Sequence, residues 1–397
     1  KRIAPDITLV TWTRPEHIKA ERGVFARTFA GKWAPQVVGG GESPVLHYDE
    51  LVIRAAEEYL TQSHEKPQFI LVGTYGPHFP YVAPPELFYK YLKTARLPAT
   101  FGTRDDFMNP VLCALQEPDI RPEVGLACQA AYKGMVEHTD GLVGRVRRAF
   151  GAFVGGRRTP HLFGYLSDHG DTIGEHGVFG KKTFFEKSVK IPLLLAGTGV
   201  AAGRRWDEPV SILDVGPTVC AWAGAETPER ADGQSLASIL RGEDGPRGRA
   251  VLSESMDKGP DGRWTYGCMA RRGTYKFITY HGYESQNMLF DVAADPLEQN
   301  NLAAARPGMC EEFRWLLRQA TDPAAAEALQ AQHTKRARVL AAFEKQTGYD
   351  DRERYRDYPE EAKRPPEVCV TSLVGGPGKE QSSVYHGLPL RPQEGKA

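Results

Sequence analysis

Residues 162–195 constrain the fold and the chemistry of this chain more than any other stretch. Two apolar runs, residues 162–166 and 191–195, have the composition of buried strands. Between them, five acids and imidazoles fall within nine residues: Asp168, His169, Asp171, Glu175 and His176. Such side chains just after the carboxyl end of a buried strand are typical of metal or anion sites in open α/β sheets. The stretch therefore predicts half of a metal-assisted active site.

Helix-like and strand-like segments alternate through the first part of the chain. Residues 48–60 and 123–150 repeat apolar side chains at near-3.6 spacing, which predicts two amphipathic helices. Residues 67–72 form an apolar run between turn residues and predict a buried strand. This alternation indicates an α/β fold with a mainly parallel, doubly wound sheet flanked by helices.

The composition changes at residues 242–249, a polar segment with glycine and proline that predicts a hinge. Strand-like patterns follow to residue 283, and residues 310–343 read as helix. We therefore predict three parts: an α/β core over residues 1–245, a smaller subdomain of antiparallel sheet and helix over 246–349, and an extended surface tail over 350–397. The charged, proline-rich tail is a candidate contact for a homo-oligomer.

Charge and cysteine content exclude several classes of protein. Fifty basic and fifty acidic residues leave a formal net charge of zero, so there is no bulk electrostatic attraction for nucleic acid or an anionic membrane. No apolar run approaches the length of a bilayer-spanning helix. The six cysteines are scattered, without a C-x-x-C pair, which argues against a zinc ribbon and favours reduced thiols in a cytoplasmic protein.

Four residues carry the predicted chemistry. Asp168 and His169 offer a carboxylate and an imidazole to a divalent cation. Lys181 can place a positive charge on a tetrahedral anion such as sulfate or phosphate. His78 follows the predicted strand at 67–72 and can bind the same anion or protonate a leaving oxygen. The plainer alternatives are a solvated lysine and a structural histidine. Asp171 and Glu175 have supporting or surface positions, and we expect His176 at the surface.

An ordered series of motifs extends this pattern over residues 45–305. The chain resembles the formylglycine-dependent sulfatases of the alkaline phosphatase superfamily, and within them the choline-sulfatase-like and phosphonate-monoester-hydrolase-like branch. The motifs that carry the resemblance are PHxPY at residues 77–81, SDHGDxxGEHGxxGK at 167–181, the following Glu186, IP at 191–192, LDxxPT at 213–218, DGxSL at 232–236 and DPxExxNL at 295–302.

The resemblance implies an alkaline-phosphatase-like α/β fold and a role for each matching residue. Asp168 and His169 match the second pair of metal ligands, around one divalent cation: Ca²⁺ first, with Mn²⁺ or Mg²⁺ as alternatives. Lys181 matches the lysine that grips the transferred group, and His78 the histidine near the leaving oxygen. The implied substrate is a small-molecule sulfate ester.

The chain also departs from the family pattern. It starts at Lys1 without the first strand, its paired Asp ligands or the CxPSR-type motif whose residue becomes formylglycine. We expect roughly 100 residues to precede it, enough for the first strands and crossovers of a parallel sheet. Gly31-Lys32-Trp33 resembles a family segment but has Ala34 where a histidine belongs. Cys268 fits a relaxed modification signature, but it falls in a predicted strand, so we reject it as nucleophile.

Three functions remain open from the sequence. The first is a sulfatase that hydrolyses a sulfate monoester. The second is a phosphonate monoester hydrolase, or a phosphomonoester or phosphodiester hydrolase, on the same scaffold. The third is a non-catalytic sulfatase-like fragment or pseudoenzyme, because this sequence contains no nucleophile motif.

Overall fold

The computed structural model describes residues 2–4, 7–8, 38–41, 43–103, 108–116, 120–155 and 159–347. The chain divides into two compact units. Unit 1 comprises residues 1–102, 117–159 and 343–397, and unit 2 comprises residues 103–116 and 160–342. The predicted tail at 350–397 and the Gly31-Lys32-Trp33 segment lie outside the described residues.

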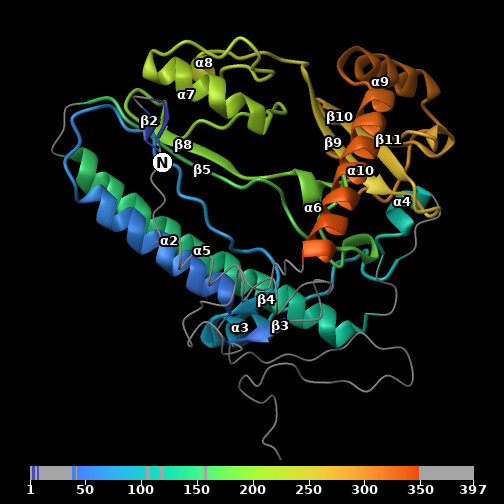
Figure 1. Cartoon of the computed structure of the whole chain (residues 1–397), viewed down its shortest axis with the longest axis horizontal. Helices are drawn as coiled ribbons and strands as arrows, with labels where there is room; N and C mark the ends of the chain where they lie inside the picture. Colours follow the sequence, from blue (N-terminus) through green and yellow to red (C-terminus); the bar gives the residue numbers. More distant parts are fainter. Residues whose placement is uncertain are drawn as a thin grey trace, which may run out of the picture. The chain divides into compact units, whose positions relative to one another are not determined.

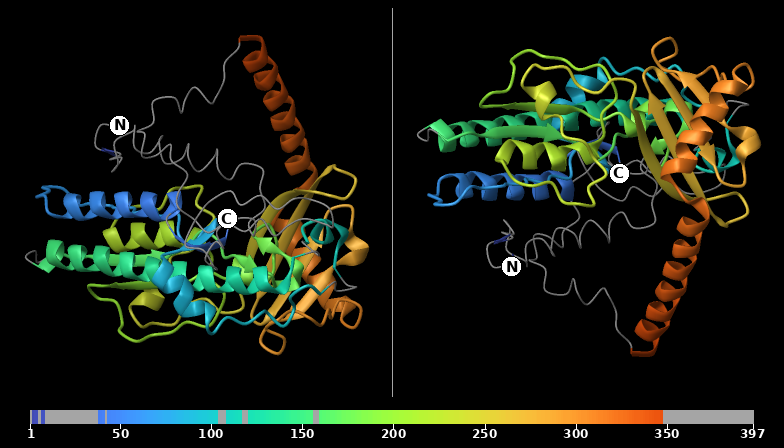
Figure 2. Two further views of the ribbon diagram at one scale, coloured as in Figure 1. Left: turned by 90° about the horizontal axis from the view of Figure 1, so that it is seen from below. Right: turned by 90° about the horizontal axis from the view of Figure 1, so that it is seen from above.

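Two long helices lie side by side in unit 1, α2 (Pro44–Leu60) and α5 (Pro122–Gly155) (Figures 1 and 2). They confirm the predicted helices at 48–60 and 123–150 and extend both. The Oγ atom of Ser43 caps α2 by accepting a hydrogen bond from the Leu46 amide at 3.3 Å. The remaining elements of unit 1 are β1 (Arg2–Ala4), β2 (Ile7–Thr8), β3 (Val38–Gly40), β4 (Tyr81–Ala83) and α3 (Pro85–Leu92).

The strands β3 and β4 form a parallel pair beneath α5. Val38 pairs with Tyr81, and all residues of both strands are buried. Gly134 of α5 allows the close approach, because a Cβ atom there would lie 2.7 Å from the Cβ atom of Ala83. This pair is the parallel component of the fold among the described residues.

Unit 2 begins with the two strands that the sequence predicted on either side of the acidic stretch. They are β5 (Leu162–Leu166) and β8 (Leu193–Gly197), and they pair antiparallel, with Leu162 opposite Gly197. The sequence predicted a mainly parallel sheet, but β5 and β8 are antiparallel. The predicted burial of both strands is wrong as well, because none of their residues is buried and Leu194 is 60% exposed. An apolar run decides neither the direction nor the burial of a strand, since both depend on its neighbours. Short elements complete this part: α4 (Pro110–Cys113), β6 (Thr172–Ile173), β7 (Phe179–Gly180), α6 (Glu186–Val189), α7 (Val215–Ala223) and α8 (Ala237–Leu240).

The predicted small antiparallel sheet is present in unit 2. Its strands, in the spatial order β12-β11-β10-β9, are β9 (Ala250–Lys258), β10 (Trp264–Arg272), β11 (Tyr275–Tyr280) and β12 (Met288–Asp291). The helix α9 (Pro307–Ala320) packs on one face of this sheet (Figure 2). Phe313 of α9 stacks there on Phe277, with ring centroids 5.8 Å apart. The predicted helix at 310–343 is two helices, because α10 (Pro323–Thr347) starts anew at a proline.

Hydrogen bonds connect the LDxxPT segment at residues 213–218 with the DGxSL segment at residues 232–236. The carboxylate of Asp214, with no exposed surface, accepts hydrogen bonds from the amides of Ser211 and Gln234, both at 2.8 Å, and pairs with Arg249. Thr218 accepts a hydrogen bond from the Leu236 amide at 2.8 Å. These motif residues therefore have a structural role next to β8.

The predicted buried strand at residues 67–72 is wrong. These residues form no strand, and Phe69 and Leu71 are 76% and 71% exposed. An apolar run becomes a buried strand only where a neighbouring strand and a covering layer exist. Among the described residues, no strand pairs with this segment.

The predicted domain boundary at residue 245 stays a prediction. The small sheet does start at Ala250, but the contacts group it with residues 160–342 in unit 2. Within the described ranges, no helix combines the length and apolar content needed to cross a membrane.

Candidate active site

Asp168 and His169 follow β5 directly and point their reactive atoms at one place. The His169 amide donates to Asp168 Oδ1 at 2.9 Å, and His169 Nε2 lies 3.6 Å from Asp168 Oδ2. His169 Nδ1 lies 2.7 Å from the carbonyl oxygen of Gly170, which only accepts, so Nδ1 carries the proton. Nε2 is then the nitrogen with the lone pair, as in metal-binding histidines oriented by a carbonyl.

The same two side chains are accessible from solvent. The Asp168 side chain is 83% exposed and that of His169 is 33% exposed. The pair suits two adjacent positions in the coordination sphere of a divalent cation. Because Ca²⁺ takes about 6–8 oxygen ligands and a structural Zn²⁺ takes about four, two donors are part of a set. No group of three or more His, Cys, Asp or Glu side chains suited to a metal occurs among the residues that the structure describes.

Lys181 lies within the electrostatic reach of this pair. It follows β7, after Gly180 with a φ of 83°, and its side chain is half-buried. Burial lowers the pKa of the Lys181 ammonium, while the carboxylates of Asp168 and Asp171 oppose that shift. Asp168 is thus one of the charges that act on Lys181. The placement of Lys181, Asp168 and His169 in one site stays a prediction. A half-buried ammonium is suited to bind a tetrahedral anion.

The segment that carries the donor pair is fixed by α6. The Gly170 amide donates to the carbonyl oxygen of Ser188 at 2.6 Å. A Cβ atom at Gly170 would lie 2.0 Å from the carbonyl oxygen of Lys187, so only glycine fits this approach. The helix α6 therefore sets the position of the residues next to His169.

The expectation that His176 lies at the surface is wrong. Its side chain is 3% exposed and stacks on Phe185 with ring centroids 4.2 Å apart. His176 Nε2 lies 3.0 Å from the carbonyl oxygen of Leu297. The turn between Gly174 and Gly177, both with positive φ, directs the ring inward, which residue type alone does not reveal. Glu175 caps the same turn by accepting from the Ile173 amide at 2.7 Å.

His78 belongs to unit 1, where its loop is fixed by a buried carboxylate. His78 Nδ1 lies 2.6 Å from the carbonyl oxygen of Phe79 and donates to it, so Nε2 is the nitrogen available for proton exchange. The amides of Tyr75 and Gly76 donate to Asp49 Oδ1 and Oδ2 at 2.6 and 2.8 Å. Asp49, in α2, is 1% exposed. Sequence reasoning missed this positioning role, because Asp49 looks like any acid on a helix.

Comparison with known proteins assigns the family. The model of the sulfatase family matches residues 21–225, and that of the N-sulphoglucosamine sulphohydrolase C-terminal region matches residues 174–318. The chain belongs to the sulfatase family. The resemblance inferred from the motifs is therefore confirmed.

Curated relatives of this sulfatase-family chain include two groups. It is 30% identical over 291 residues to a choline-sulfatase of Rhizobium meliloti (strain 1021), covering 67% of this chain and 54% of the relative. It is 33% identical over 206 residues to arylsulfatase K of Danio rerio, covering 49% of this chain and 37% of the relative. The chain thus spans about half or less of the length of these relatives.

Solved structures support the α/β fold. The phosphonate monoester hydrolase of Agrobacterium radiobacter aligns with a TM-score of 0.59 at 21% identity, over 81% of this chain and 70% of that chain. A 2-O GAG sulfatase aligns with a TM-score of 0.58 at 23% identity, over 71% of this chain and 64% of that chain. At these identities the likeness concerns the fold alone.

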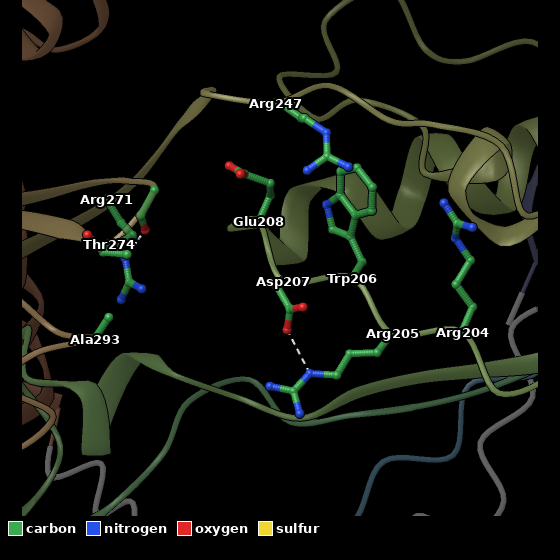
Figure 3. Close-up of a pocket in the computed structure, with 10 residues that line it drawn as sticks. Arg204, Arg205, Trp206, Asp207, Glu208, Arg247, Arg271, Thr274 and Ala293 are labelled. Atoms are coloured by element: carbon green, nitrogen blue, oxygen red, sulfur yellow. Dashed lines mark hydrogen bonds and ion pairs between the residues drawn. The ribbon is translucent and has the colours of Figure 1, made fainter.

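Two further features of the sulfatase-family chain lie away from the donor pair. Cys268 is 3% exposed in β10, and burial raises the pKa of its thiol to about 12, so it is unsuited to nucleophilic attack. A pocket of about 550 Å³ in unit 2 has several arginines on its walls, and none of the predicted site residues lines it (Figure 3). Its guanidinium groups have partners, such as Asp207 for Arg205 at 2.7 Å.

The buried Asp49 carboxyl predicts a defined pH dependence of stability. Burial raises its pKa from 3.8 to about 6, against the two amide hydrogen bonds. The folded protein therefore binds more protons at this site than the unfolded chain between these pH values, so the free energy of unfolding falls as pH rises through that window. Relative to Asp49→Asn, we expect wild type to lose up to about 3 kcal/mol from about pH 4 to about pH 6.5.

Urea denaturation of both proteins across this pH range measures the difference. Glu58→Gln provides the control, because Glu58 is an exposed residue of the same helix. A difference between wild type and Asp49→Asn that does not change with pH would show that Asp49 titrates alike in the folded and unfolded states.

Proposed function

We propose that the protein containing this chain is a sulfatase that hydrolyses a small-molecule sulfate monoester. The observation that carries the proposal is that unit 2 holds the Asp168–His169 pair and a half-buried Lys181 on which the charge of Asp168 acts, within a chain that matches the sulfatase family model. The site offers a cation-binding pair and a fixed ammonium to one tetrahedral anion. These are the groups that sulfate transfer needs.

In this proposal Asp168 and His169 hold one divalent cation, Ca²⁺ first, with Mn²⁺ or Mg²⁺ as alternatives. The carboxylate suits each of these ions, and the imidazole Nε2 leans toward a transition metal. When bound, the cation would neutralise charge that develops on the transferred group. We expect its further ligands from the paired Asp residues that the resemblance implies.

Lys181 and His78 keep, in this proposal, the roles that the resemblance implies for the two residues. Lys181 binds a non-bridging oxygen of the sulfate, and its partial burial strengthens that attraction over the same contact in water. His78, oriented by the Phe79 carbonyl, would act as the doubly protonated imidazolium, which keeps its proton on Nδ1 and gives the proton on Nε2 to the leaving alkoxide. The net reaction breaks the S–O bond to the alcohol and consumes one water, which yields the free alcohol and sulfate.

The proposal includes two features that belong to the resemblance. The nucleophile is a formylglycine, from a part of the protein that this sequence does not contain. The sheet of the intact protein is mainly parallel and doubly wound. The parallel pair β3–β4 supports this arrangement.

Hydrolysis of a phosphonate monoester is the second candidate function. It is favoured by the fold likeness to the phosphonate monoester hydrolase of Agrobacterium radiobacter. Sulfate is preferred because both family models and the curated relatives bear sulfatase names. A non-catalytic role is the third candidate, because this sequence contains no nucleophile motif.

A matched pair of substrates separates these functions. The intact protein, loaded with Ca²⁺ or Mn²⁺ in parallel, is assayed on the sulfate ester and the phenylphosphonate ester of 4-nitrophenol. The proposal predicts a higher kcat/KM for the sulfate ester. A higher value for the phosphonate would establish the second candidate, and no turnover of either ester would favour the third.

Replacing Lys181 tests the anion-binding assignment within the site. Lys181→Ala should lower kcat/KM on the preferred ester by about 10²–10³-fold, because it removes charge stabilisation of the transition state. Lys182→Ala is the matched control, since Lys182 is the exposed neighbour, and it should change kcat/KM by less than about threefold. Equal effects of both substitutions would remove Lys181 from the site.

A further inference from the structure

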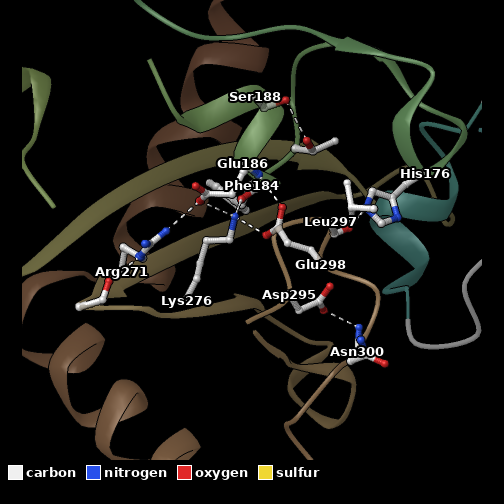
Figure 4. A network of polar contacts seen from close by, with 12 residues as sticks. His176, Phe184, Glu186, Ser188, Arg271, Lys276, Asp295, Leu297, Glu298 and Asn300 are labelled. Carbon is white, nitrogen blue, oxygen red and sulfur yellow. Dashed lines mark hydrogen bonds and ion pairs between the residues drawn. The ribbon is translucent and has the colours of Figure 1, made fainter. Parts of the chain in front are cut away.

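Three residues from separate parts of the sequence meet in a buried cluster of unit 2 (Figure 4). Glu186 follows the glycine-lysine segment, Lys276 lies in β11, and Glu298 belongs to the DPxExxNL motif. Lys276 has no exposed surface. Its Nζ atom donates to the carbonyl oxygen of Phe184 at 2.8 Å, lies 3.1 Å from Glu186 Oε1, and forms an ion pair with Glu298. Two sequence motifs and the strand β11 thus each supply one residue of a buried cluster.

Further contacts link Glu298 to the backbone of Glu186, and Glu186 to Arg271. Glu298 Oε2 accepts a hydrogen bond from the Glu186 amide at 2.6 Å, and Arg271 donates to Glu186 Oε1 at 3.0 Å. The two positive and two negative side chains balance in formal charge. Glu298 holds a positive φ of 55°, which a residue with a side chain adopts at some cost unless its contacts enforce it. The cluster therefore fixes the backbone of both segments.

From this cluster, α6 extends to both parts of the candidate site. It starts at Glu186, and Lys181 is five residues earlier in the chain. Between them, Phe184 and Phe185 are buried against the small sheet. At the other end of α6, the carbonyl oxygen of Ser188 accepts from the Gly170 amide at 2.6 Å. A single short helix is thus attached to the Lys181 segment and to the segment of Asp168 and His169.

We propose that Lys276, with Glu186 and Glu298, is the positioning element that sets Lys181 against the donor pair. The proposal rests on the function proposed above for Lys181. Lys276 itself contacts Phe184 and Glu186, at the start of α6, and acts through them. The small antiparallel sheet thereby contributes to catalysis without placing a side chain on the substrate.

The chemistry of the cluster favours positioning over stability. A buried ion pair can often be replaced by apolar side chains with little loss of stability, because desolvation offsets the attraction. Its charged groups do, however, demand particular partners at particular places. Burial opposes ionisation of Glu186, but the charges of Lys276 and Arg271 lower its pKa below the ordinary value. Glu186 thus remains an anion that holds α6 to β10 and β11.

The test combines a structural readout with a kinetic cycle in the intact protein. The network variant is Lys276→Met with Glu298→Gln, which removes one charge of each sign. The control is Arg272→Met, which breaks a more exposed ion pair with Glu312 on the same sheet. Amide hydrogen exchange is measured well below the unfolding temperature. We expect exchange at least tenfold faster at residues 168–170 and 181–188 in the network variant, and no change there in the control.

In the kinetic cycle, Lys276→Met and Glu298→Gln are introduced together into two backgrounds, the wild-type protein and the Lys181→Ala variant. We expect at least a tenfold loss of kcat/KM in wild type and less than a threefold further loss in Lys181→Ala, since coupled residues are non-additive. Unchanged exchange at both segments would overturn the proposal whatever the activity. An equal loss in both backgrounds would assign the network a merely structural role. If wild type turns over no ester, the proposed function fails, and the exchange result still decides the positioning.

Discussion

The ammonium group of Lys276 has no exposed surface, and three oxygen atoms around it replace the water that it gave up. Removing a charge from water is unfavourable unless the interior supplies opposite charge and hydrogen bonds. Here the carboxylates of Glu186 and Glu298 and the carbonyl oxygen of Phe184 do so. Because Lys276, Glu298 and the segment of Phe184 and Glu186 are three separate parts of the sequence, the pairing defines how the small sheet meets the segment that carries Lys181.

The candidate site is built on that support. The donors Asp168 and His169 sit at the end of β5, and their spacing of 3.6 Å suits a shared cation. Lys181 is half-buried, and the charge of the Asp168 carboxylate opposes the lowering of its pKa by burial. His78 has its own support in the other unit, where the Asp49 carboxylate holds two backbone amides of its loop. Each reactive side chain is thus accessible, while the groups that orient it are buried.

The pattern of apolar and turn residues predicted the helices and strands whose formation depends mainly on residues near them in the sequence. The strands around the acidic stretch, the long helices and the small antiparallel sheet follow from periodicity and turn residues. Residues 67–72 show where this fails, since their burial depends on neighbours that a local pattern does not specify. The antiparallel pairing of β5 and β8 was missed for the same reason.

The candidate site was predicted from motif order, but its supports were not. His176 and Asp49 are buried polar groups whose partners, Leu297 and the amides of Tyr75 and Gly76, are distant in sequence. Lys276 looked like part of an ordinary strand. Only the fold reveals that Lys276 forms ion pairs with Glu186 and Glu298, which belong to two different motifs.

Anomalous diffraction from crystals of the intact protein loaded with Mn²⁺ tests the central claim most directly. The account predicts one strong peak within about 2.0–2.6 Å of both the Asp168 carboxylate and His169 Nε2. Lys181 should lie on the side of the ion that faces the substrate anion. A fully occupied peak away from Asp168 and His169, with none between them, would contradict the account.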